Sequence, residues 1–258
     1  NNFENINFKI PNSGINADVI FDPVKKNLTS GIFKSKILSM NLKAHFDFND
    51  RILNIKNLYF RNKNLSFKNN SSIAFKPFLD IESNFDVEEF NFKILQNAKL
   101  ENLVVYKNLI KKINSKNQIY FKSKKFARNK IEEAKIKIDL AYGRLDFEKK
   151  FLVLNANFLC KGYINIFEEF PLIFFDCNLT SNNRKKFLQQ FSIKEKNKNQ
   201  TLDLKVQGNV SLINEKINLK NILVDENYKA SKEDLIYFKQ TFEEIVLKEG
   251  LFEIYEFK

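Results

Sequence analysis

The single histidine of this 258-residue chain, His45, limits the chemistry that the sequence can support. Ser/His/Asp triads, Cys/His dyads and multi-histidine metal sites all need imidazole as a base or a ligand. His45 also falls on the polar side of an alternating run over residues 40–48, which predicts a solvated surface side chain. We therefore predict no catalytic residues and no metal site, and a protein that is not an enzyme.

The sequence also lacks a phosphate-binding loop, and its paired acids do not form a catalytic motif. The six glycines are too dispersed to form a glycine-rich loop that brings backbone N–H groups to a phosphate, so we expect no nucleotide or other cofactor. Adjacent carboxylates do occur, but neighbouring side chains project in different directions, and solvated turns and helix faces explain them. These pairs are Glu88 with Glu89, Glu132 with Glu133, Glu168 with Glu169, and Glu243 with Glu244.

The two cysteines, Cys160 and Cys177, are placed to face each other across a hairpin. If residues 160–166 and 172–179 are strands joined by a turn near Glu168, directly opposed residues have numbers that add up to about 337–339, as this pair does. A cross-strand disulfide and two buried free thiols both fit. We favour the free thiols because cross-strand disulfide geometry is often strained.

The chain is basic and rich in phenylalanine, with a formal net charge of +12, 28 Phe, no Trp and one Met. A basic chain can bind nucleic acid, anionic lipid or an acidic partner. Arginine is much rarer than lysine in this chain. Lysine lacks the planar guanidinium group that forms bidentate hydrogen bonds with phosphates and bases. Because the lysines are spread over the polar positions of most predicted strands, we expect no nucleic-acid partner.

Alternation of apolar and polar residues is the dominant pattern of the sequence. It is unbroken over residues 40–48, 134–140 and 202–206, and over 79–87 it breaks only at Ser83. Such alternation is typical of antiparallel strands with one apolar face and one polar face. Shorter runs of the same kind raise the expected number of strands to about fourteen.

Helical patterns are few and short. The clearest covers residues 231–249, where Ser231 and Asp234 form a capping box and Gly250 ends the helix. Its apolar stripe consists of Leu235, Phe238, Phe242, Ile245 and Val246. Weaker helices are predicted near residues 92–113 and 183–191. A weak internal similarity favours repeated structural units, because Pro77 and Pro171 each precede a predicted strand and then a predicted helix.

Three short helices cannot cover a sheet of a dozen or more strands, and open sheets of that size curl, close or split into a sandwich. We therefore expect a mainly β protein, a long curved antiparallel sheet that forms an open, repeating β-groove with a few short packing helices. Residues 1–230 would form the groove, and residues 231–258 a helix and a strand that continues it. We expect this stretch to be a fragment of a longer chain, because it starts at Asn1 with neither a signal peptide nor a membrane span.

Six segments share a common pattern within a stretch from residue 31 to residue 225: residues 31–42, 52–60, 65–67, 73–80, 87–90 and 131–148. In this pattern they resemble the AsmA-like proteins of Gram-negative bacteria. The resemblance implies a periplasmic β-groove, anchored to the inner membrane by a segment outside this fragment. It further implies a part in phospholipid transport between the inner and outer membranes and in outer-membrane biogenesis. The implied partners are phospholipid acyl chains, beside envelope proteins that the sequence does not identify.

An apolar groove would keep acyl chains out of water, where each exposed methylene costs about 0.8 kcal/mol. We expect nine side chains to line it: Phe46, Phe48, Phe75, Ile81, Phe85, Ile136, Ile138, Leu202 and Leu204. The alternative for these residues is the ordinary core of a β-sandwich, in a structural envelope protein with a filled core and no ligand. A basic nucleic-acid-binding module is a further alternative.

Overall fold

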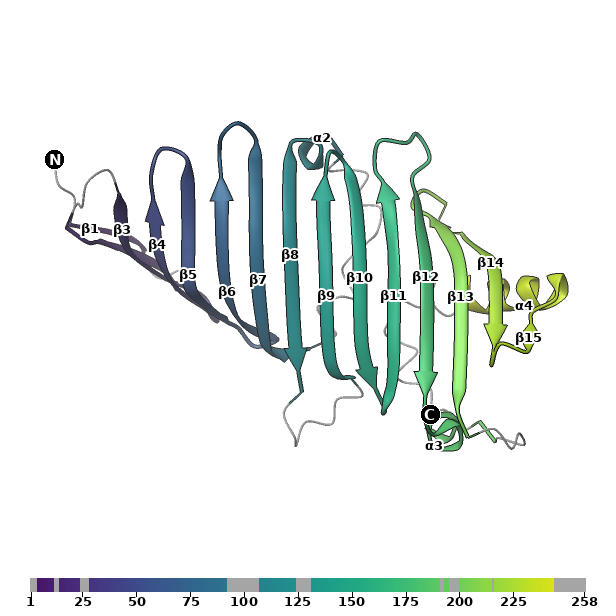
Figure 1. The fold of residues 1–258 in the computed structure, drawn as a ribbon. Helices are drawn as coiled ribbons and strands as arrows, with labels where there is room; N and C mark the ends of the chain where they lie inside the picture. Colours follow the sequence, from purple (N-terminus) through teal and green to yellow (C-terminus); the bar gives the residue numbers. More distant parts are fainter. Residues whose placement is uncertain are drawn as a thin grey trace.

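A computed structural model describes residues 4–11, 14–23, 28–91, 107–123, 131–190, 193–194, 200–214 and 216–243. Within these ranges, fifteen strands form one sheet and follow one another across it in sequence order (Figure 1). The predicted fold class, a mainly β protein built on a long curved sheet with few helices, is confirmed.

The strands have the following bounds. The first half of the sheet contains β1 (Asn5–Ile10), β2 (Ile15–Phe21), β3 (Thr29–Ile37), β4 (Met40–Phe48), β5 (Ile52–Arg61), β6 (Leu65–Ala74) and β7 (Leu79–Phe90). The second half contains β8 (Ile113–Lys122), β9 (Ile131–Ala141), β10 (Arg144–Val153), β11 (Ala156–Asn165), β12 (Leu172–Ser181), β13 (Leu202–Ser211), β14 (Ile217–Val224) and β15 (Tyr228–Lys229).

One strand pair departs from the expected antiparallel order. Strands β7 and β8 are parallel, whereas every other neighbouring pair in the described sheet is antiparallel. A parallel pair needs a crossover connection of about a dozen residues or more. The connection here includes helix α2 (Lys107–Ile110). The helix predicted near residues 92–113 ends too late, because Ile113 already begins β8, and residues 92–106 lie outside the described ranges.

The two halves of the predicted repeat also differ. Pro77 precedes β7, which leads to the parallel strand β8, whereas Pro171 precedes β12, which leads through helix α3 (Arg184–Gln189) to the antiparallel strand β13. The two segments are therefore similar only in the proline that precedes a strand. The units that follow have different topologies.

Strand register sorts the side chains into two faces, because directly paired residues project to the same side of a sheet. We call the apolar face the side that carries Phe46, Phe85, Ile138 and Leu204 with their cross-strand partners. We call the opposite side the polar face; it carries His45, which is exposed as expected. The register thus confirms that these four apolar side chains share one face.

The three described helices pack against parts of the apolar face. Phe187 of α3 contacts Ala156 and Leu202, and α2 places Ile110 against a cluster that includes Ile164. Helix α4 (Lys232–Phe242) packs against β14, where Ile217, Leu219 and Ile222 are buried and Leu235 lies against them. Figure 1 shows α2 and α3 at opposite ends of the strands and α4 beside β14.

Helix α4 begins as the sequence predicts. Ser231 accepts a hydrogen bond from the backbone N–H of Asp234, whose carboxylate accepts one from the backbone N–H of Ser231. Leu235 packs inward, but Phe238 of the same predicted stripe remains 39% exposed. The other side chains of that stripe and the predicted final strand lie outside what the structure describes.

Glycines on the apolar face make room for aromatic rings. Phe147 lies opposite Gly162, and Phe46 lies opposite Gly31. A Cβ atom on Gly162 would lie 2.0 Å from the carbonyl oxygen of Phe174 and 2.4 Å from the Phe147 ring. Glycine is therefore required there by a close backbone approach, and the ring fills the space above it.

Candidate functional site

Eight of the nine predicted lining side chains lie in strands of the apolar face, and the ninth, Phe75, directly follows β6. The eight are Phe46 and Phe48 in β4, Ile81 and Phe85 in β7, Ile136 and Ile138 in β9, and Leu202 and Leu204 in β13. They extend across ten strands, so the structure places them on one surface but not in one compact pocket.

Exposure separates these side chains into open and covered positions. Phe48 and Phe75 are 39% and 49% exposed, and six others are half-buried. Leu202 differs, because it is only 7% exposed and packs beneath Phe187 of α3. Leu202 is therefore a core residue under a helix, and its assignment to an open groove is wrong.

The described strands belong to a single sheet, so the apolar face does not pack on a second described sheet as it would in a sandwich. Phenylalanine rings follow one another over this face. The Phe60 and Phe67 ring centroids are 5.0 Å apart, and those of Phe67 and Phe85 are 5.5 Å apart. Phe60 and Phe67 were missing from the predicted lining, although the same alternation marks them.

A short polar row crosses the apolar face between β6 and β8, and Ser83, the break noted in the sequence, belongs to it. The Ser71 and Ser83 hydroxyls are 2.8 Å apart, and Ser71 donates to Oδ1 of Asn69. In β8, Nδ2 of Asn117 donates to Oγ of Ser115 and to the backbone oxygen of Ile138. These polar groups form hydrogen bonds with one another and with the backbone, so the free-energy cost of burying the row is small.

Lys149 in β10 is a charged side chain on the apolar face. Its cross-strand neighbours are Ile136 in β9 and Cys160 in β11. Its Nζ atom lies 4.9 Å from the centroid of the Phe147 ring. Burial lowers the pKa of the Lys149 ammonium below its usual value. Lys149 was missing from the predicted site residues, although the alternation of Leu145, Phe147, Lys149 and Phe151 in the sequence already places it among apolar positions.

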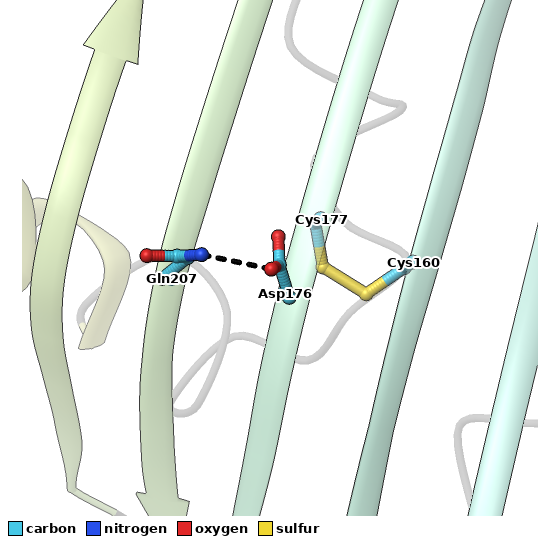
Figure 2. Close-up of a disulfide and its surroundings, with 4 residues drawn as sticks. All are labelled: Cys160, Asp176, Cys177 and Gln207. Carbon is cyan, nitrogen blue, oxygen red and sulfur yellow. Dashed lines mark hydrogen bonds between the residues drawn. A yellow bond between two sulfur atoms is a disulfide. The ribbon is translucent and has the colours of Figure 1, made fainter.

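The two cysteines are directly paired between β11 and β12, as the hairpin register predicts. Their Cα atoms are 4.0 Å apart and their sulfurs are bonded, so the favoured prediction of free thiols is wrong (Figure 2). The disulfide lies on the apolar face, next to Lys149 in the same row of cross-strand neighbours. It joins two strands of the surface on which the predicted lining residues lie.

A hollow of about 600 Å³ lies over β9 to β14, and its side chains come mostly from the polar face. Tyr163 and Phe174 stack at its floor with centroids 4.9 Å apart. The Arg144 guanidinium lies 4.3 Å from the centroid of Tyr163, and Lys220 Nζ lies 5.4 Å from that of Phe174. None of the nine predicted lining residues borders this hollow.

Charges of both signs mix over the polar face. Gln207 donates to Asp176 at 2.8 Å (Figure 2). Lys56 pairs with Asp47 at 2.6 Å, and Lys116 approaches Glu82 at 3.7 Å. Lysines that alternate with carboxylates over many strands give a solvated surface, as the spread of lysines in the sequence predicts.

Glu148 provides a pH test of these polar-face contacts. Hydrogen bonds from Lys150 and Lys161, at 2.8 and 3.1 Å, lower the pKa of Glu148 to about 2. Because this value lies below the usual 4.5, the contribution of Glu148 to stability is complete above pH 4.5 and is lost as the pH falls through 2. We expect an NMR titration to give an apparent pKa near 2, and Lys150→Met to raise it.

Lys56→Met, remote from this cluster, is the control and leaves the titration of Glu148 unchanged. A wild-type pKa at the usual value would show that the Lys150 and Lys161 contacts do not persist in solution.

No family model, curated protein or solved structure matches this chain. Among the described residues, no helix is long and apolar enough to cross a membrane. In the same ranges, no three His, Cys, Asp or Glu side chains cluster in a way that could hold a metal ion. Function is therefore inferred from the chemistry of the two faces of the sheet.

Proposed function

We propose that this chain is an AsmA-like groove protein that holds phospholipid acyl chains against its apolar face. In this proposal it is a periplasmic part of a protein anchored to the inner membrane by another segment. It takes part in phospholipid transport between the inner and outer membranes and in outer-membrane biogenesis, and it does no chemistry on the lipid.

One observation carries the proposal: apolar side chains continue on one face across strands β1 to β14 of a single sheet. The three described helices cover parts of that face near β8 and β11 to β14. At the β1 edge of the sheet large apolar side chains are exposed to solvent, and Phe8 in β1 is 56% exposed. A surface that is apolar, extended and partly uncovered fits a ligand that is itself apolar and elongated.

Transfer energetics give the mechanism. At about 0.8 kcal/mol per methylene, two acyl chains cannot cross an aqueous compartment without cover. Against the apolar face the chains replace water at Phe46, Ile81 and Phe85. Phe48, Leu53, Ile73 and Ile81 form one cross-strand row from β4 to β7, so an acyl chain can lie against apolar side chains over these strands.

Native mass spectrometry of the purified protein, with lipid extraction from the same sample, tests the proposal. We expect phospholipid to remain bound through purification in the absence of detergent. A sample stripped of lipid with detergent should take up phospholipid again from phosphatidylethanolamine and phosphatidylglycerol vesicles. Failure of both experiments, together with weak binding of an apolar dye, would support a structural protein with a filled core.

A further inference from the structure

Lys149 is unusual among the charged residues of this sheet. At the directly paired positions of the described strands, it is the one Lys, Arg, Asp or Glu that projects to the apolar face. Its neighbour Lys150 projects to the polar face and pairs with Glu148 at 2.8 Å. Strand alternation alone places the two lysines in opposite environments.

The surroundings of Lys149 contain no counter-charge in the part of the chain that the structure describes. Phe147 and Phe151 flank it along β10, and Ile136 and Cys160 flank it across the sheet. The contact of its ammonium with the Phe147 ring compensates only in part for lost hydration. Burial correspondingly lowers the pKa of Lys149. A cation in such surroundings is stabilised by an anion, and no described residue beside Lys149 supplies one.

The row of side chains that contains Lys149 leads directly into the predicted lining. Register places Phe85 of β7, Ile119 of β8 and Ile136 of β9 in succession beside it. With about 4.8 Å between strands, this row extends about 14 Å from β10 to β7. In the other direction it meets the disulfide and then Val206, which packs against the helix-covered cluster of β14. The less covered path for an alkyl chain therefore runs from Lys149 toward β7.

We propose that Lys149 binds the anionic group of an amphiphile, a carboxylate or a phosphate, whose alkyl chain lies along the apolar face toward β7. This inference depends on the proposed function and adds to it the class of ligand and the position of the head. The ion pair forms beside apolar side chains, where screening by water is weak. The chain contacts Ile136, Ile119 and Phe85 in turn.

Three probes share one sixteen-carbon chain and differ only in the head group: palmitate, hexadecyl phosphate and hexadecanol. Their comparison distinguishes the contribution of the head group to binding from that of the alkyl chain. Equilibrium dialysis with the full chain measures each dissociation constant below the aggregation concentration of the probe. We expect both anions to bind about tenfold more tightly than hexadecanol, the usual strength of a hydrogen bond to a charged group. Preference for one anion over the other identifies the head as a carboxylate or a phosphate.

Two neighbouring lysines provide a matched pair of variants. Lys149→Met keeps the length and apolar stem of the side chain, and we expect it to weaken binding of the anions to the level of hexadecanol. Lys149→Arg retains the charge and restores the preference. Lys150→Met, one residue away on the polar face, behaves as the wild type. Circular dichroism and a melting curve for each variant confirm that the sheet is folded.

The outcomes distinguish the two proposals. If all three probes bind and Lys149→Met retains the preference for anions, the inference about Lys149 is wrong and acyl-chain binding stands. Equal binding of anions and hexadecanol by the wild type leads to the same conclusion. If none of the probes binds to the folded protein, the proposed function fails and the inference fails with it.

Discussion

Phe85→Asp is expected to remove bound phospholipid while the sheet remains folded. Phe85 is half-buried on the apolar face, between Asn69 in β6 and Ile119 in β8. A carboxylate desolvated against acyl chains costs several kcal/mol unless it becomes protonated. We expect at least a tenfold loss of co-purified lipid, from about 1.4 kcal/mol or more of lost binding energy. The melting temperature should fall less than it would for a closed core, because water can reach the new charge.

Asn84→Asp is the matched control for this variant. It introduces the same carboxylate one residue away on β7, but Asn84 is exposed on the polar face, so we expect wild-type lipid content. Ile138→Asp repeats the test on β9 and should behave as Phe85→Asp does. Joint loss of lipid and fold would favour a filled core. Retention of lipid in both folded variants would contradict the placement of acyl chains at these positions.

Gly162→Ala is expected to destabilise the protein strongly for so small a change. The added Cβ would lie 2.0 Å from the backbone oxygen of Phe174, so a strand has to move. The same Cβ would meet the Phe147 ring at 2.4 Å. Overpacking of this kind costs about 1–3 kcal/mol, which a thermal or denaturant unfolding curve resolves readily.

Asn157→Ala is the control for the glycine, because Asn157 lies on the same strand with its side chain exposed on the polar face. A surface change of this kind usually alters the free energy of unfolding by less than about 0.5 kcal/mol. The addition of Phe147→Leu to Gly162→Ala should restore only part of the lost stability, since the conflict with the backbone oxygen remains. A Gly162→Ala protein as stable as the wild type would show that β11 and β12 do not approach so closely in solution.

Local patterns were enough to predict many features of the fold. Residues 40–48 alternate, and they form β4 with Phe46 and Phe48 on the apolar face. Ser231 and Asp234 predicted the start of α4 through a capping contact between residues three apart. The spacing of Cys160 and Cys177 predicted their pairing, because a hairpin register depends only on the position of its turn.

Several features depend on contacts between distant segments and escaped prediction. The parallel pairing of β7 with β8 depends on where the chain re-enters the sheet after α2, which alternation does not encode. Helix α3 covers Leu202, and nothing in the residues around Leu202 marks it as different from Leu204. The polar-face hollow draws residues from six strands, β9 to β14, and no local stretch contains its pattern.

By itself, the sequence determined which residues become strands and which face each side chain takes, because a period of two is a property of consecutive residues. It also determined the charged, solvated character of the polar face. Only the tertiary structure decided how the strands follow one another, which parts of the apolar face the helices cover, and that Lys149 lies in the same row as Phe85 and Ile136. These features depend on which segments pack together, and packing sums weak contacts between residues far apart in the chain.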